Sequence, residues 1–209
     1  MELTDLNVTS FLDELASDSA APGGGSVAAL GGALGAALAA MVARLTVGKE
    51  KYRNHWVAME QLRDAADALR KRFLDLMRQD AASFNAFMDA MKLPKETEAQ
   101  KADRSCAMQG ALLQAARIPL ETVRAAGEMA RLARQAVEHG NPNAVTDAGT
   151  AALFARATAL AAAYNVRANL LALKDQEIVN RFRRDLDQAL AETLATADAV
   201  LPLVEAKLS

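Results

Sequence analysis

An apolar run between two short polar motifs constrains the fold of this chain more than any other feature. The run extends from Val27 to Val47, is built largely from Ala and Gly, and contains one charged residue, Arg44. Its length matches that of a membrane-spanning helix, but Ala and Gly partition only weakly into a bilayer. We therefore expect a buried helix over residues 25–47, in a protein with no membrane partner. Gly31 and Gly35 would let a second helix approach it closely.

The rest of the sequence also predicts helices, because apolar residues recur at helical spacing and no alternating strand pattern occurs. Proline and glycine mark the boundaries: Pro94 follows the end of one helix, Pro119 begins another, and Gly140 ends it. The expected helices cover residues 10–16, 25–47, 54–91, 96–116, 119–139, 146–173 and 175–206. The predicted fold class is all-α, a mostly antiparallel helical bundle with long, Ala/Gly-rich helices in one domain over residues 1–209.

Charge and cysteine content narrow the classes of partner and the location. The net charge is −2 and no long basic run occurs, which argues against a nucleic-acid partner. Cys106 is the only cysteine, and the N-terminus lacks the basic region of a secretory signal, so we expect a cytoplasmic protein. His55 and His139 are far apart, with no cysteine or acidic pair at ligand spacing, and we therefore predict no metal site.

One acidic residue occupies a position where a core residue is expected. The helix over residues 54–91 carries an apolar stripe formed by Leu62, Leu69, Phe73, Leu76, Phe84, Phe87 and Met91. Asp80 continues this stripe between Leu76 and Phe84. Burial would raise its pKa and let it hold a proton near neutral pH, as a general acid or proton shuttle requires. The alternative is a buried ion pair with Arg44 or another basic side chain.

The two motifs that flank the apolar run both suit a ligand. The first comprises Gly23, Gly24, Gly25 and Ser26. It places backbone N–H groups at a helix N-terminus, where an anion is favoured. The second comprises Lys49, Lys51 and Tyr52. Its lysines suit a carboxylate-rich tail, although a solvated turn is the simpler interpretation.

Two amides lie one turn apart in the helix over residues 146–173. Asn165 and Asn169 each offer a donor and an acceptor, which suits the edge of a heterocycle. Hydrogen bonding between helices is an equally good interpretation. Asp147, near the start of the same helix, is most simply its N-cap.

With these residues in view, nearly the whole chain resembles the cyclodeaminase/cyclohydrolase family. The resemblance rests on motifs spread along the sequence: Ala21-Pro22-Gly23-Gly24-Gly25-Ser26, Leu45-Thr46-Val47-Gly48-Lys49, Lys51-Tyr52, Asp80, Gly140-Asn141 with Asn143, Asp147-Ala148, Asn165-Val166 and Asn169-Leu170. Two positions depart from the family pattern. Arg44 stands where the family often has Asn, and Thr146 where it often has Ser. We expect Arg44 to add a charge near the site.

The resemblance implies a homodimer that acts on a tetrahydrofolate derivative, with no cofactor beyond that substrate, and an Asp80 that transfers protons. We expect the glycine amides and the two lysines to hold the glutamate tail, and the two asparagines to bind the pterin. The full set of expected substrate-binding residues is Gly23, Gly24, Gly25, Ser26, Lys49, Lys51, Tyr52, Asn143, Asp147, Asn165 and Asn169.

The expected activity is that of a stand-alone methenyltetrahydrofolate cyclohydrolase, because 209 residues leave no room for a formiminotransferase domain. The alternative is a formiminotetrahydrofolate cyclodeaminase, which forms methenyltetrahydrofolate with loss of ammonia. A second alternative is a helical interaction protein without catalytic activity, packing through its Ala/Gly faces.

Overall fold

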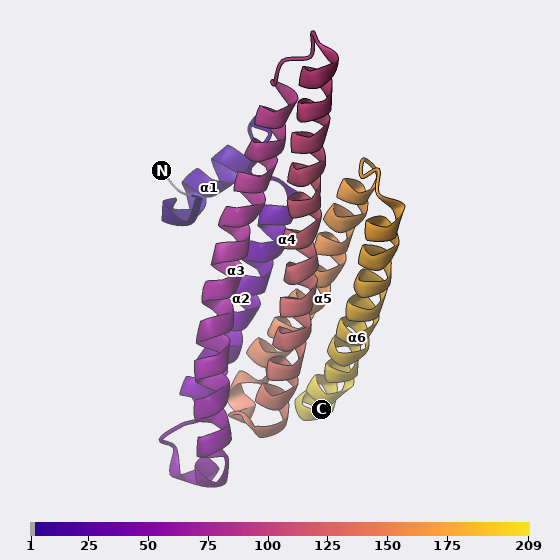
Figure 1. Cartoon of the computed structure of the whole chain (residues 1–209). Coiled ribbons are helices and arrows are strands. Elements are labelled where there is room, and N and C mark those ends of the chain that lie inside the picture. Colours follow the sequence, from indigo (N-terminus) through magenta and orange to yellow (C-terminus); the bar gives the residue numbers. More distant parts are fainter. Residues whose placement is uncertain (1–2) are drawn as a thin grey trace.

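The computed structural model describes residues 3–209, and this part of the chain contains helices and no strand (Figure 1). The α-helices are α1 (Val8–Leu15), α2 (Gly24–Arg44), α3 (Trp56–Met91), α4 (Glu98–His139), α5 (Val145–Leu170) and α6 (Gln176–Leu208). Three short 3₁₀ helices accompany them: η1 (Leu3–Asp5), η2 (Glu50–His55) and η3 (Pro142–Ala144). The predicted all-α bundle is confirmed.

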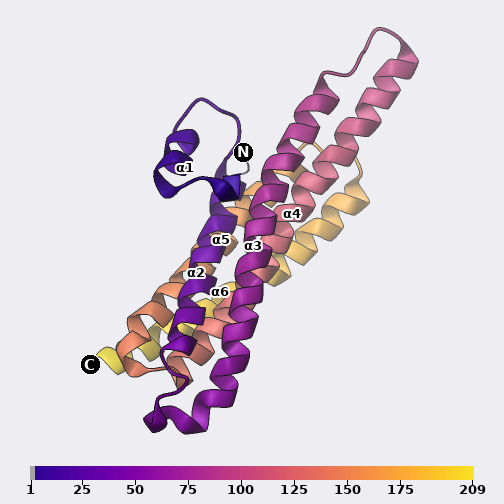
Figure 2. The ribbon, with the colours of Figure 1, turned by 90° about the vertical axis from the view of Figure 1, so that its left-hand side faces the viewer.

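Helices α2 to α6 run alternately up and down, so that consecutive helices are antiparallel neighbours (Figures 1 and 2). Helix α4 is central, because it packs against α2, α3, α5 and α6. Helix α2 lies between α3 and α5 on one side of α4. Helix α1 lies at the side of the bundle near the first residue of α2 (Figure 2), and its Phe11 is buried in the core. This arrangement leaves one long face of α2 without a neighbour within the described chain.

Small side chains bring α2 close to its neighbours. Most of its buried residues are Ala or Gly, and Gly32 shows why: a Cβ there would lie 2.4 Å from Cε1 of Phe73 in α3. Phe73 is fully buried because its ring lies against the α2 backbone. The Ala-rich composition therefore gives dense contact between helix backbones rather than interlocking of large side chains.

The apolar character of α2 has a structural explanation within the bundle. Among the described residues it is the one helix long and apolar enough to cross a membrane, judged by length and composition alone. In its most apolar window 61% of the residues are buried against the rest of the protein. A core helix has the same composition, so the expectation that the chain does not cross a membrane stays a prediction.

The break expected between residues 116 and 119 does not exist, because α4 continues through Pro119. Proline has no N–H to donate to the carbonyl four residues earlier, which here belongs to Ala115. The side-chain amide of Asn169 in α5 donates to that carbonyl, with an Nδ2–O distance of 2.7 Å. The missing helix hydrogen bond is thus replaced from a neighbouring helix, and the prediction of two helices was wrong.

Several helix ends differ from expectation in detail. Helix α5 begins after Ala144, with no side-chain cap, so that Asp147 lies in its first turn and is not the N-cap. Side-chain N-caps occur in three other helices, where an oxygen of Asn7 (α1), Thr97 (α4) or Asp175 (α6) accepts from backbone N–H groups of the first turn. Helix α2 has only Gly23 at its N-cap and no capping side chain. Its first N–H groups are therefore available to other partners.

Candidate active site

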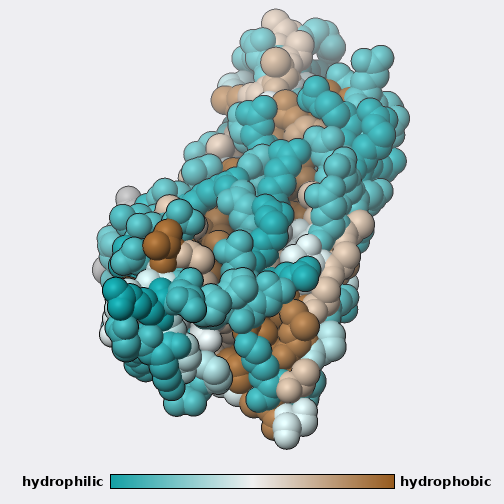
Figure 3. All heavy atoms as spheres, turned by 90° about the horizontal axis from the view of Figure 1, so that it is seen from below, coloured by the Kyte–Doolittle hydropathy of each residue, from teal (hydrophilic) through white to brown (hydrophobic). Residues whose placement is uncertain are grey.

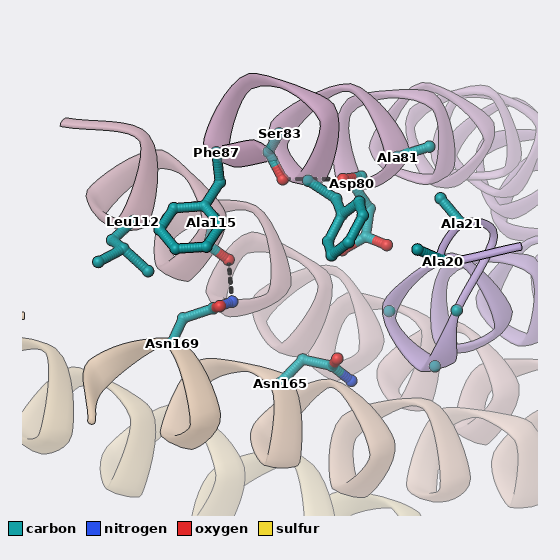
Figure 4. Close-up of a pocket in the computed structure, with 14 residues that line it drawn as sticks. Ala20, Ala21, Asp80, Ala81, Ser83, Phe87, Leu112, Ala115, Asn165 and Asn169 are labelled. Carbon is teal, nitrogen blue, oxygen red and sulfur yellow. Dashed lines mark hydrogen bonds between the residues drawn. The ribbon is translucent and has the colours of Figure 1, made fainter. Parts of the chain in front are cut away.

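A pocket of about 280 Å³ lies where α2 begins. The Asp80 carboxyl group of α3 lies next to Gly25, and the Asn165 side chain of α5 lies next to Gly24. Beyond these contacts α3 continues to Met91 and α5 to Leu170. The pocket thus occupies the space that further turns of α2 would fill. It is lined by Ala20, Ala21, Gly23, Gly24, Gly25, Asp80, Ala81, Ser83, Phe84, Phe87, Leu112, Ala115, Asn165 and Asn169 (Figure 4). The structure therefore brings together the first glycine motif, the predicted acid and both predicted amides.

The carboxyl group of Asp80 lies against the first turn of α2. A Cβ at position 25 would be only 2.2 Å from Oδ1 of Asp80, so a residue larger than Gly25 would displace the carboxyl group. The Ser26 hydroxyl donates to Oδ2 of Asp80, with an O–O distance of 2.9 Å. The chain enters this turn through a cis Ala21–Pro22 peptide bond. The glycine motif thus serves in part to admit an acid from another helix.

Two opposing effects set the protonation of Asp80. Burial raises its pKa above the ordinary value of 3.8, and this effect prevails. Hydrogen bonds from the Ser26 hydroxyl and backbone N–H act in the other direction, because they favour the carboxylate. No basic side chain pairs with Asp80 anywhere in residues 3–209, and the partner considered for a buried ion pair, Arg44, binds Asp67 instead. Asp80 is thus a partly buried, unpaired acid that faces a pocket, as a proton-transfer group requires.

Asn165 and Asn169 lie across the pocket from Asp80 (Figure 4). Their Nδ2 groups donate to main-chain carbonyls, Asn165 to Ala161 at 2.9 Å and Asn169 to Ala115 at 2.7 Å. Hydrogen bonding between helices, the alternative interpretation, therefore holds for one donor of Asn169, whereas Asn165 bonds within its own helix α5. Within the described residues no protein group donates to either Oδ1 atom. The two amides consequently offer acceptors to the N–H groups of a ligand.

Two aromatic residues of the pocket were predicted only as core. Phe84 and Phe87 continue the apolar stripe of α3 beyond Asp80, but both are only partly buried and line the pocket. They are partly exposed because α2 does not extend alongside this part of α3. The sequence signal for their exposure was the glycine motif, because it marks the first residue of α2, which lies next to Asp80. Aromatic faces on one side and amide acceptors on the other suit a flat heterocycle.

A second hollow of about 600 Å³ adjoins the pocket. The two share Ala20, Ala21, Ala81 and Phe84, and the second is bordered by Leu3 and by Arg78. Arg78 already donates to Asp75 and to the Thr4 hydroxyl. Sequence reasoning did not identify this hollow, because it forms where the N-terminal segment returns to α3. Together the two hollows give room for a ligand larger than one ring system.

The remaining predicted residues lie at the opposite end of α2. Lys49, Lys51 and Tyr52 follow its last residue, and Asn143 and Asp147 lie beside the start of α5. A helix of 21 residues is about 31 Å long, so these groups are remote from Asp80 of the same chain. Within one chain they do not form one site with the pocket.

This opposite end is organised around the buried side chain of Asn141. The Tyr52 hydroxyl and the Asn143 backbone N–H both donate to its Oδ1 atom, at 2.9 and 3.1 Å. Its own Nδ2 donates to the Leu45 carbonyl. The Lys51 ammonium lies 4.6 Å from the centre of the Tyr52 ring. Tyr52 thus has a structural role here, while the two lysines are exposed.

Two expectations concern charged and metal-binding groups. Arg44 ends α2 and lies at the end that carries Lys49 and Lys51, not beside Asp80 of the same chain, and the expectation that it adds a charge near the site stays a prediction. In the described range, no three His, Cys, Asp or Glu side chains gather at a spacing that fits a metal ion. His55 and His139, far apart in sequence, stack with ring centres 5.0 Å apart. The prediction of a site without metal is untested.

Comparisons with known proteins confirm the resemblance seen in the sequence. The family model described as formiminotransferase-cyclodeaminase matches residues 7–188. A methenyltetrahydrofolate cyclohydrolase from Methylorubrum extorquens is 38% identical over 202 residues, which cover 97% of each chain. A formimidoyltransferase-cyclodeaminase from Rattus norvegicus is 33% identical over 205 residues, which cover 98% of this chain and 38% of the rat protein.

A solved structure agrees with this assignment. The crystal structure of a formiminotetrahydrofolate cyclodeaminase from Thermotoga maritima matches with a TM-score of 0.89 and 28% sequence identity, and the match covers 100% of both chains. The similarity thus extends over the pocket and over the opposite end of α2 alike. On the strength of the family model and the full-length relative, this chain belongs to the formiminotransferase-cyclodeaminase family.

Proposed function

We propose that this chain is a methenyltetrahydrofolate cyclohydrolase, which hydrolyses methenyltetrahydrofolate to formyltetrahydrofolate in one-carbon metabolism. The observation that carries the proposal is Asp80, an acid with a raised pKa that faces a pocket at the N-terminus of α2. The full-length similarity to the Methylorubrum extorquens cyclohydrolase supports it. No cofactor beyond the folate is part of the proposal.

The pocket suits the pterin end of a folate. Its volume of about 280 Å³ is near the lower limit of ligand sites, so it takes part of such a molecule and the adjoining hollow takes more. The Oδ1 atoms of Asn165 and Asn169 would accept from the N–H groups of the pterin. Phe84 and Phe87 would lie against its flat rings. These contacts would hold the one-carbon centre beside Asp80.

Asp80 would then move protons between water and the substrate. A water molecule adds to the cationic methenyl carbon, a C–O bond forms, and the Asp80 carboxylate accepts the proton that the water loses. One of the two bonds from this carbon to nitrogen then breaks, and the added hydroxyl group becomes the formyl C=O as its proton passes to solvent water. The ring opens, and the released nitrogen takes the proton held by Asp80. A carboxyl group with a raised pKa suits both steps, because it is a stronger base when ionised and can return the proton.

The same pocket supports a second candidate, formiminotetrahydrofolate cyclodeaminase. In that reaction the folate nitrogen attacks the formimino carbon, Asp80 takes the proton from the attacking nitrogen, and the departing amine leaves protonated as ammonia. The fold match to the Thermotoga maritima cyclodeaminase and the similarity to the rat protein favour this candidate. Both reactions form or break bonds at one carbon held between two nitrogens.

Steady-state assays with methenyl- and formimino-tetrahydrofolate, run side by side, test the proposal. We expect turnover of the methenyl substrate, and we expect Asp80→Asn to reduce it at least about a hundredfold, on the usual scale of acid–base effects. Asp89→Asn is the matched control, since it makes the same change on an exposed part of α3 and should leave the rate unchanged.

The outcomes separate three functions. Faster turnover of the formimino substrate would identify the chain as a cyclodeaminase and not a cyclohydrolase. Wild-type turnover by Asp80→Asn would reject the role of this acid. If neither substrate reacts and tetrahydrofolate derivatives leave the melting temperature unchanged, the chain is a helical interaction protein, because a bound ligand raises that temperature.

Partners and location belong to the same proposal. The chain would act as a homodimer in the cytoplasm, with a tetrahydrofolate derivative as its ligand and without nucleic acid or membrane. Cys106, its single cysteine, is exposed and forms no disulfide, which suits a reducing compartment.

A further inference from the structure

The two amides of the pocket differ in how firmly their orientation is fixed. Nδ2 of Asn165 donates to the Ala161 carbonyl, one turn earlier in α5, at 2.9 Å. The α-helix already supplies that carbonyl with a donor, the backbone N–H of Asn165. Nδ2 of Asn169 donates to the Ala115 carbonyl of α4 at 2.7 Å, and Pro119 leaves this carbonyl without a helical donor. Only the second amide thus meets an acceptor that depends on it.

The Ala115 carbonyl determines which atom of the Asn169 amide remains for a ligand (Figure 4). A carbonyl oxygen only accepts hydrogen bonds, so it holds the NH2 group and excludes Oδ1. Turning the amide over would set two oxygens against each other and leave the partly buried carbonyl without a donor. Oδ1 is therefore the atom of this side chain that a ligand meets, and it accepts but cannot donate.

The backbone of α4 thus decides what the pocket offers at this position. With any residue other than proline at position 119, a backbone N–H would bond the Ala115 carbonyl, and the Asn169 amide could then present either its oxygen or its NH2 group. Pro119 is buried and is not among the residues that line the pocket. It can therefore act on a ligand only through Asn169.

We propose that Pro119 is a positioning residue that makes the pocket selective for ligands with an N–H donor facing Asn169. A 4-oxo pterin carries such a donor on the ring nitrogen beside its 2-amino group. In a 2,4-diamino pterin the same nitrogen is a bare acceptor, which would face Oδ1 lone pair to lone pair. This inference rests on the proposed function for the identity of the ligand, while the orientation of the amide is independent of it.

Binding of a matched ligand pair tests the selectivity. Calorimetry gives the dissociation constants of tetrahydrofolate and its 4-amino-4-deoxy analogue for the wild type and Pro119→Ala, at a pH where the analogue is uncharged. We expect the wild type to bind tetrahydrofolate at least about tenfold more tightly, because the analogue leaves Oδ1 unpaired. In Pro119→Ala the amide can turn over, so the ratio should fall to about threefold or less.

The ratio of the two constants is the decisive quantity, because a loss of stability alone weakens both ligands alike. An unchanged ratio in Pro119→Ala, or a wild type without preference, would overturn the proposal. Pro119→Val is measured alongside, since it restores the same backbone N–H with a side chain closer in volume to proline. It keeps the test open if Pro119→Ala does not fold.

Pro202→Ala is the matched control, since Pro202 is the other proline inside an α-helix of the described chain. It is exposed in the last two turns of α6. These turns lead to the C-terminus, at the end of the bundle that Figure 3 views and that shows a largely hydrophilic surface. The substitution should leave the ligand ratio at its wild-type value. A fall in this variant as well would assign the effect to proline loss in general and overturn the proposal.

Solvent exchange of the Asn169 side-chain amide supplies a readout that needs no ligand. In ¹⁵N-labelled protein its NH2 group is the resonance pair that is missing in both Asn169→Ala and Asn169→Asp. The proton donated to the Ala115 carbonyl should exchange at least about tenfold faster in Pro119→Ala than in the wild type. Unchanged exchange would overturn the positioning role. Faster exchange in a protein that binds neither ligand would support that role and reject the proposed function.

Discussion

Asp80 is a residue whose chemistry depends on groups distant in sequence. It belongs to α3, but its nearest neighbours are Gly25 and Ser26 of α2. Burial raises its pKa, while the hydrogen bonds from Ser26 partly oppose the rise. Gly25 allows this contact, since any Cβ would fall within the space of the carboxyl group.

The pH dependence of turnover should report on Ser26. If the carboxylate of Asp80 is the base, kcat/KM falls as the pH drops through the pKa of Asp80. Ser26→Ala removes a donor that favours the carboxylate, so the pKa should rise further and the acid limb of the profile should move to higher pH. Profiles of kcat/KM against pH for both proteins measure the shift.

Ser83→Ala is the matched control for this experiment. Ser83 lines the same pocket, but its hydroxyl donates to the backbone carbonyl of Asp80 and not to its carboxyl group. Its removal should leave the acid limb in place. If the acid limb of the pH profile also stays in place in Ser26→Ala, Asp80 is not the group whose pKa sets that limb.

The raised pKa of Asp80 also predicts a change in stability. The folded protein holds this proton more tightly than the unfolded chain, whose carboxyl group titrates near 3.8. The stability that this group contributes is therefore present below that pH and lost as the pH rises through the folded pKa. Asp80→Asn should raise the melting temperature at pH 7, and the difference should shrink toward pH 4. Melting curves of the wild type, Asp80→Asn and the comparison variant Asp89→Asn across this pH range measure the difference. If the melting temperatures of wild type and Asp80→Asn do not converge toward pH 4, the raised pKa of Asp80 is contradicted.

At the scale of single elements, α4 shows how one helix depends on another. Pro119 leaves the Ala115 carbonyl without its helical donor, and Asn169 of α5 supplies one. The hydrogen bond is partly buried, because Ala115 and Asn169 also line the pocket. The same amide therefore both completes α4 and lines the pocket.

This dependence can be measured with a double-mutant cycle. Asn169→Ala should reduce the free energy of unfolding by about 1–3 kcal/mol, because it removes the hydrogen bond to a partly buried carbonyl. In a Pro119→Ala background the backbone N–H of residue 119 restores the helical bond, and the loss should be smaller. Denaturant unfolding of the four proteins gives the values. Equal losses in both backgrounds would show that the amide does not compensate for the proline.

The expectation of a break at Pro119 failed for this same reason. Sequence rules treat an internal proline as the end of a helix, because the lost hydrogen bond and the ring are costly. They take no account of a donor that arrives from fifty residues further along the chain. The prediction that the apolar stripe of α3 is core also holds only in part beyond Asp80, where Phe84 and Phe87 line the pocket and are partly exposed.

At the scale of the whole molecule, the lengths of the helices create the site. Helix α2 is short, and its neighbours α3 and α5 extend past its first residue, so a pocket forms beyond it. The length of α2 also separates the two groups of predicted residues by about 31 Å. The expectation of one site for all of them cannot be met within a single chain.

The sequence by itself determined the helical class, the apolar α2 and the chemical character of Asp80. Periodicity and composition are local properties, and an acid in an apolar stripe is visible in the pattern alone. Only the tertiary structure decided that Gly25 leaves space for the Asp80 carboxyl group and that Asn169 replaces the hydrogen bond that α4 loses at Pro119. It also decided that Lys49 and Lys51 lie at the end of α2 opposite to Asp80. Those facts depend on which helices pack together and where each one stops, and both are set by contacts between residues far apart in the chain.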